Sequence, residues 1–184
     1  FLLMWLDPDL AADETPERPP HHCFREVGVA AWRTSWQARE PDIYFGFKAG
    51  RTAANHSHLD CNSFVLHGHG RPLLADPGDW PYAHSMGYFD TEAERWRFDC
   101  NSTIGHNTLL VNGRGQQYGH GRGAEIVASR SGEGYDYLAS EAASAYGRPL
   151  VQFRRHALFL RPDIIVLVDQ VRLGRPDAVT WLFH

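Results

Sequence analysis

The sequence has little lysine, little cysteine and no long apolar run. The shortage of cysteine and the lack of long apolar runs each exclude a class of protein. Only one of its 18 basic residues, Lys48, is a lysine, and the other 17 are arginines. No apolar run approaches the roughly 20 residues that a membrane-spanning helix requires, so no membrane span is expected. The formal net charge of -4 argues against a nucleic-acid partner, because it gives no bulk attraction to a polyanion.

The three cysteines, Cys23, Cys61 and Cys100, are odd in number and widely spaced. This pattern excludes a disulfide framework and a thiolate zinc site of the Cys-x-x-Cys type. A bond between Cys61 and Cys100 is one alternative, but buried free thiols are the expectation for such residues. The arginine excess suits bidentate binding of carboxylates, although a GC-rich genome accounts for most of it.

The composition is that of one folded domain, with 43% hydrophobic and 12% aromatic residues among 184. The first residue is not Met, and the apolar stretch 1–6 is short and has no basic flank, so it does not read as a signal peptide. We therefore expect a fragment of a longer protein. Residues 11–20 contain three prolines and mixed charge, which predicts that residues 1–22 are a junction or linker and that residues 23–184 form the domain.

Short segments rich in β-branched and aromatic residues, separated by turn-forming residues, predict an all-β fold. Asn112-Gly113 and Arg161-Pro162-Asp163 are turn sequences, and His67-Gly68-His69 falls in a hairpin turn. Such a series is typical of an antiparallel β-sandwich, with a short helical piece expected at 91–98. The expected strands are 27–33, 43–48, 64–66, 72–75, 108–111, 125–129, 135–141, 151–160, 164–171 and 179–184. The unbroken apolar run of 164–168 predicts a central strand that is covered on both faces.

Three short segments concentrate imidazole and carboxylate groups: Asn55–Asp60, Ala75–Gly78 and Gly105–Thr108. In the first, His56 and His58 are two residues apart. On a strand, alternate residues share a face, so both rings are expected to point into one cleft. One ring would then hold a metal ion while the other meets a substrate.

The residue types alone leave two interpretations of these segments. Two imidazoles and one carboxylate, from His58, Asp76 and His106, are a common ligand set for zinc. The alternative is chance proximity, because the chain has 11 histidines and His21-His22 already forms one incidental pair.

Residues 79–105 form a long connection that is dense in aromatic and arginine side chains. Long connections in compact domains usually carry function, and aromatic faces and guanidinium forks suit sugar rings and carboxylates. Packing of these side chains on the sandwich is an equal alternative. The candidates for substrate contact are Asn55, Tyr82, Tyr88, Arg95 and Arg97.

The order of these motifs resembles the β-sandwich domain of the heparinase II/III-like polysaccharide lyases, which include alginate and oligoalginate lyases. The resemblance covers roughly residues 25–184. It is carried by the segments His56-Ser57-His58-Leu59-Asp60, Leu74-Ala75-Asp76-Pro77-Gly78, Gly105-His106-Asn107-Thr108, Ile164-Ile165-Val166-Leu167-Val168-Asp169 and Trp181-Leu182-Phe183-His184.

The resemblance implies a supersandwich-like fold that follows an N-terminal helical toroid domain, which is the expected partner of this domain. It implies cleavage of a uronic-acid-containing polysaccharide or oligosaccharide by β-elimination. His56 matches the catalytic histidine of the family's sandwich domain, and His58, Asp76 and His106 match the ligands of a structural zinc. The family's catalytic tyrosine and asparagine lie on the toroid domain and match no residue here.

The alternative is a non-catalytic carbohydrate-binding or structural β-sandwich in which a metal ion stabilises the fold. The sequence does not identify the polysaccharide, endo or exo action, or the oligomeric state. The family implies a bacterial, periplasmic or secreted protein, with an export signal outside this fragment.

Overall fold

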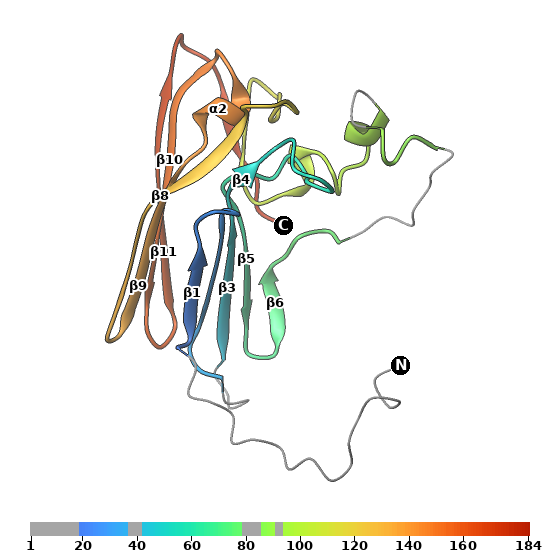
Figure 1. Cartoon of the computed structure of the whole chain (residues 1–184). Helices are drawn as coiled ribbons and strands as arrows, with labels where there is room; N and C mark the ends of the chain where they lie inside the picture. The colour runs from blue at the N-terminus through green and yellow to red at the C-terminus, as the bar shows by residue number, and fades with distance from the viewer. Residues whose placement is uncertain (1–18, 37–41, 79–85, 91–93) are drawn as a thin grey trace.

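The computed structural model describes residues 19–36, 42–78, 86–90 and 94–184. Two five-stranded antiparallel sheets pack face to face, and a two-stranded sheet adjoins them (Figure 1). The expected all-β sandwich is therefore confirmed. Among the described residues, no helix is long and apolar enough to cross a membrane.

The first sheet has the order β1-β2-β3-β5-β6. Side chains of β3 alternate between buried and partly buried positions, which places Phe45 and Phe47 on the face toward the second sheet. The hairpin between β5 and β6 turns at His69 and Gly70, both with positive φ, as the turn sequence predicted. The strands are β1 (His21–Phe24), β2 (Val29–Arg33), β3 (Ile43–Lys48), β5 (Ser63–Gly68) and β6 (Arg71–Leu74).

The second sheet has the order β11-β10-β9-β8-β4, and β7 pairs with β12 in the small sheet. The predicted turns at Asn112-Gly113 and Arg161-Pro162-Asp163 are confirmed, the latter joining the two longest paired strands. The strands are β4 (Gly50–Arg51), β7 (Leu109–Val111), β8 (Gly123–Gly132), β9 (Tyr135–Glu141), β10 (Leu150–Leu160), β11 (Ile164–Leu173) and β12 (Val179–Trp181). The helical turns are α2 (Ala143–Tyr146), η2 (Glu94–Arg97) and η3 (Thr103–Gly105).

Aromatic side chains from the first sheet form most of the main core. The rings of Phe45 and Phe64 stack with centroids 5.6 Å apart, and Trp32 stacks on Phe45 at 5.1 Å. Leu138 and Phe159 meet them from the second sheet. Burial of one such side chain contributes about 1.5–3 kcal/mol relative to exposure, so this cluster holds the two sheets together.

Two sequence predictions about the fold are wrong. The run 164–171 is a strand, but β11 is the edge strand of its sheet, and the outward Ile164 and Val168 are 54% and 52% exposed. Its inner face packs on the core through Ile165 and Leu167, whereas its outer face is exposed to solvent. Strand β1 begins at His21, inside the segment 1–22 that we assigned to a linker; pairing of His21 with Trp32 brings it into the sheet. Residues 1–18 lie outside the described part.

The cysteines are free thiols, and Cys61 and Cys100 are buried, as expected. Burial raises the pKa of Cys61 from 9.0 to about 12, and burial likewise raises the pKa of Tyr146 from 10.0 to about 12. In the unfolded chain both groups ionise at lower pH.

We expect the free energy of unfolding to fall as pH rises from 9 toward 12, because only the unfolded chain then releases these protons. Urea unfolding at pH 8 and pH 10.5 measures this difference. The fall should be smaller in Cys61→Ala. A free energy of unfolding that stays constant across this pH range in both proteins would contradict the raised pKa values of Cys61 and Tyr146.

Candidate functional site

His56 and His58 lie on the loop between β4 and β5, which contains turns and no strand. The prediction that a strand presents both rings to one cleft is therefore wrong. His56 adopts a left-handed backbone conformation with φ of 57°, which costs a non-glycine residue on the order of 1–3 kcal/mol. The loop is folded against distant segments, and Leu59 donates its N–H to the Asn101 carbonyl at 2.9 Å. Such contacts between distant segments prevent residues 56–58 from forming a strand with alternating side chains.

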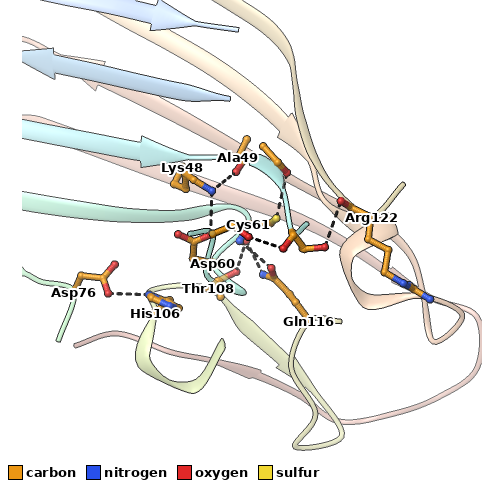
Figure 2. Close-up of polar contacts among 12 residues, drawn as sticks. Lys48, Ala49, Asp60, Cys61, Asp76, His106, Thr108, Gln116 and Arg122 are labelled. Carbon is orange, nitrogen blue, oxygen red and sulfur yellow. Dashed lines mark hydrogen bonds and ion pairs between the residues drawn. The ribbon is translucent and has the colours of Figure 1, made fainter. Parts of the chain in front are cut away.

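The C-terminal end of this loop is held by polar contacts. Lys48 donates to the Asp60 carboxylate at 3.1 Å and to the Ala49 carbonyl at 2.9 Å (Figure 2). Asn62 donates to the carbonyls of Ser140 and Phe153 in the second sheet. The only lysine of the chain thus fixes the loop that carries both histidines.

His106 and Asp76 come together from separate segments. Nδ1 of the fully buried His106 donates to Asp76 Oδ1 at 2.8 Å, and Figure 2 shows the two side chains facing each other. Gly105 precedes the histidine because a Cβ there would lie 2.2 Å from the Asp99 carbonyl oxygen. The predicted proximity of Asp76 and His106, 30 residues apart in sequence, is therefore present in the fold.

The ring of His58 lies beside that of His106, with centroids 5.4 Å apart. Burial lowers the pKa of His58 below its usual value, while the nearby Asp60 acts in the opposite direction. A neutral imidazole is the form that binds a metal ion.

The residue types fit zinc, which favours imidazole nitrogen and carboxylate oxygen. One ring nitrogen of His106, Nε2, is buried without a hydrogen-bond partner within the described part of the chain. However, no group of three or more His, Cys, Asp or Glu side chains among the described residues is arranged to hold an ion as it stands. Asp76 and His106 contact each other instead.

His56 lines a separate cleft of about 400 Å³, called here the His56 cleft. Its ring meets Phe89 edge-on at 6.1 Å. Trp96 and Tyr118 form another wall, with centroids 5.4 Å apart. Asn55 also lines the cleft, as its assignment to substrate contact would require. Tyr118 was missed because nothing in its local sequence distinguishes it.

The other predicted contact residues have different environments. Tyr88 is only 3% exposed and packs its ring against Phe89 and Phe98, so the structure shows it in a packing role. Arg97 is exposed and forms a surface ion pair with Glu94 at 2.8 Å. Tyr82 lies outside the described residues. Substrate contact by these side chains remains a prediction.

Arg95 is 5% exposed and connects the two sides of the cleft. Its guanidinium donates to the Ser57 carbonyl at 2.9 Å and to the Tyr88 carbonyl at 3.1 Å. Ser57 lies between the two histidines, so Arg95 sets the position of the loop backbone. These contacts are to protein rather than to solvent, which makes Arg95 a positioning residue in this structure.

Arg95→Ala should lower the free energy of unfolding by roughly 1.5–3 kcal/mol, the range for one hydrogen bond made by a charged group. Urea unfolding measures this loss. Arg97→Ala is the matched control and should change stability by less than about 0.5 kcal/mol, because Arg97 forms only a surface pair. Equal losses in the two variants would show that Arg95 does not hold the loop.

Asn107, next to His106, links three parts of the fold. Its side-chain amide donates to the carbonyls of Phe64 and Ala75, and its oxygen accepts from the His184 backbone N–H at 2.8 Å. Ala75 precedes Asp76. Asn107 therefore orients both chain segments that carry the Asp76–His106 pair.

Comparisons with known proteins agree with this fold. Residues 16–184 match the family described as Heparinase II/III-like, C-terminal. An exo-oligoalginate lyase from Saccharophagus degradans is 28% identical over 138 residues, covering 68% of this chain and 18% of that protein. A mutant of heparan sulfate lyase HepC from Pedobacter heparinus is structurally similar, with a TM-score of 0.73 and 18% identity over 93% of this chain and 25% of that one.

A heparinase III gene product gives a TM-score of 0.72 at 21% identity, covering 90% of this chain and 24% of that chain. The chain thus spans between 18% and 25% of the length of these relatives. The structural similarities establish the fold, and the match over residues 16–184 establishes the family.

Proposed function

Because the chain belongs to the heparinase II/III-like family of polysaccharide lyases, we propose that it is the β-sandwich domain of a lyase that cleaves a uronic-acid-containing polysaccharide by β-elimination. One observation carries this proposal: the imidazole of His56 lies in an aromatic-lined cleft, on a loop held by Lys48 and Arg95. Aromatic faces suit sugar rings, and an imidazole titrates near neutral pH.

The reaction requires a proton transfer that fits His56. The C5 proton beside the uronate carboxylate leaves, a C4–C5 double bond forms, and the bond from C4 to the glycosidic oxygen breaks. The departing oxygen takes up a proton. We assign to His56 a proton transfer at the reacting sugar. The second acid–base group, a tyrosine, is expected from the helical domain of the parent protein.

We further propose that His58, Asp76 and His106 hold a zinc ion. When bound, the ion would fix the positions of these three side chains relative to one another, and it would take no part in the elimination. The support is the donor set itself, the 2.8 Å contact between His106 and Asp76, and the unpartnered ring nitrogen of His106.

Chelation should destabilise the protein if this zinc site exists. Removing an ion present at 100 times its Kd lowers the free energy of unfolding by about 2.7 kcal/mol. Elemental analysis of protein purified without chelator should find one zinc per chain, and thermal melts should shift with chelator. In His58→Ala, zinc and the chelator effect should both disappear. Protein without stoichiometric metal, or a melting temperature indifferent to chelator, would contradict the site.

Absorbance of the unsaturated uronate product tests the lyase function directly. The full-length parent should generate this product from uronic-acid polymers, whereas the 184-residue chain should not, since it lacks the helical domain's acid–base group. A parent that binds these polymers without forming product would support the alternative, a non-catalytic carbohydrate-binding sandwich.

A further inference from the structure

A second cavity, of about 450 Å³, is lined by the chain segment that directly precedes the Tyr118 wall of the His56 cleft. Arg114, Gly115 and Gln117 line this cavity, while the adjacent Tyr118 lines the His56 cleft. Its other walls come from the turn after α2 and from the connection between β11 and β12, around Arg148 and Arg175. We call it the arginine pocket.

Backbone hydrogen bonds connect the walls in pairs. Asn112 donates to the Ala178 carbonyl at 2.7 Å, Gly174 donates to the Pro149 carbonyl at 3.1 Å, and Gln117 donates to the Ala145 carbonyl at 2.8 Å. Each bond joins two segments that are distant in sequence. The pocket is therefore formed before any ligand arrives, which reduces the entropic cost of binding.

The charge around the pocket is positive although the chain as a whole is negative. Arg114, Arg148 and Arg175 line it together with one carboxylate, Asp177, which lies 3.8 Å from Arg175. Within the described part of the chain, the guanidinium groups of Arg114 and Arg148 form no hydrogen bond or ion pair. Guanidinium groups stay charged at all relevant pH values and match the geometry of carboxylates and sulfates.

The remaining lining offers little apolar surface to a ligand, because Tyr146 and Val111 are only 2% and 3% exposed. Pro149 is partly exposed there. The Tyr146 hydroxyl is already used, since it donates to the Leu109 carbonyl at 2.8 Å and accepts from Gln116 at 3.1 Å. The pocket is thus a preformed hollow whose ligand-binding groups are mainly cationic, and its volume falls in the range of small-ligand sites.

We propose that the arginine pocket binds an acidic sugar of the polymer through its carboxylate or sulfate, as a subsite beside the His56 cleft. This inference rests on the proposed function for the identity of the polymer. Binding itself needs no catalysis, so the pocket and the lyase activity can fail independently.

Amide NMR spectra of the 184-residue chain test the pocket with defined probes: a trisaccharide of mannuronic acid, glucose 6-sulfate and neutral maltotriose. The acidic probes should shift the amides of Gly113 and Gly174, and maltotriose should not. Response to the trisaccharide identifies a carboxylate site, and response to glucose 6-sulfate identifies a sulfate site.

The double variant Arg114→Gln/Arg148→Gln should bind the effective probe roughly 10- to 100-fold more weakly, as expected for lost charge-assisted hydrogen bonds. Arg130→Gln, an exposed residue near the opposite end of β8 from α2, is the matched control and should bind normally. His56→Ala should also retain binding at Gly113 and Gly174. Equal shifts with maltotriose, shifts confined to the amides of Ala54 and Ser57, or full affinity in the double variant would overturn the proposal.

Discussion

His56→Ala in the full-length parent should lower turnover of a uronic-acid polymer by roughly 10²–10⁴-fold, the usual range for loss of an acid–base group. The imidazole lies in the His56 cleft, and no other histidine lines that cleft among the described residues. The loss should fall on the rate constant for cleavage. Initial rates of unsaturated product, measured at saturating and at low polymer concentration, separate this effect from weaker binding.

Two controls distinguish catalysis from loss of structure. His67→Ala removes an exposed histidine of β5 and should leave turnover unchanged. His56→Ala itself should melt close to the wild-type temperature or slightly lower, because the ring is exposed and histidine adopts the left-handed backbone conformation somewhat more readily than alanine. Full activity of His56→Ala would remove the histidine from the mechanism.

Arg155→Ala should lower the free energy of unfolding by about 3–5 kcal/mol, the range for breaking a buried ion pair. The guanidinium is 1% exposed and pairs with both carboxylate oxygens of Asp169, at 2.8 and 2.7 Å. Nη1 also donates to the carbonyls of Asn62 and Asn107, at 2.6 and 2.8 Å. These two residues lie in the chain segments that carry the predicted metal ligands, so the substitution should also disturb the site.

Urea unfolding of the 184-residue chain measures this effect. Replacing both partners, Arg155→Met with Asp169→Leu, should recover only part of the loss. The apolar pair removes the carboxylate that has lost its guanidinium, but it leaves the two carbonyls without a donor and removes the hydrogen bond from Trp181 Nε1 to Asp169. A loss under about 1 kcal/mol in Arg155→Ala, or complete recovery in the double variant, would mean that the carbonyl contacts contribute little.

Short-range features of the sequence predicted much of the fold. The bounds expected for 43–48 and 135–141 are those of β3 and β9, because residue alternation and flanking turn residues act within a few positions. Asn112-Gly113 turns as expected for the same reason. The segments bearing His58, Asp76 and His106 were also identified from the order of motifs, and the fold brings them together.

The features that sequence did not predict depend on partners that are distant along the chain. An apolar run such as 164–168 marks a strand, but its position at the sheet edge depends on which strands pair with it, and the exposure of its second face depends on what packs over the sheet. From the sequence, Arg95 suited either substrate contact or packing. The fold places its guanidinium between the carbonyls of Ser57 and Tyr88, which shows a positioning role. Tyr118 became part of the His56 cleft only through the position of its loop.

The sequence by itself therefore determined most of the strands, the main turns and the residue types of the candidate site, since each follows from local conformational preference or side-chain chemistry. Only the tertiary structure decided that His56 and His58 diverge to different neighbours, and that three arginines surround a common pocket. Those outcomes depend on packing between segments that are distant along the chain, which no local pattern encodes.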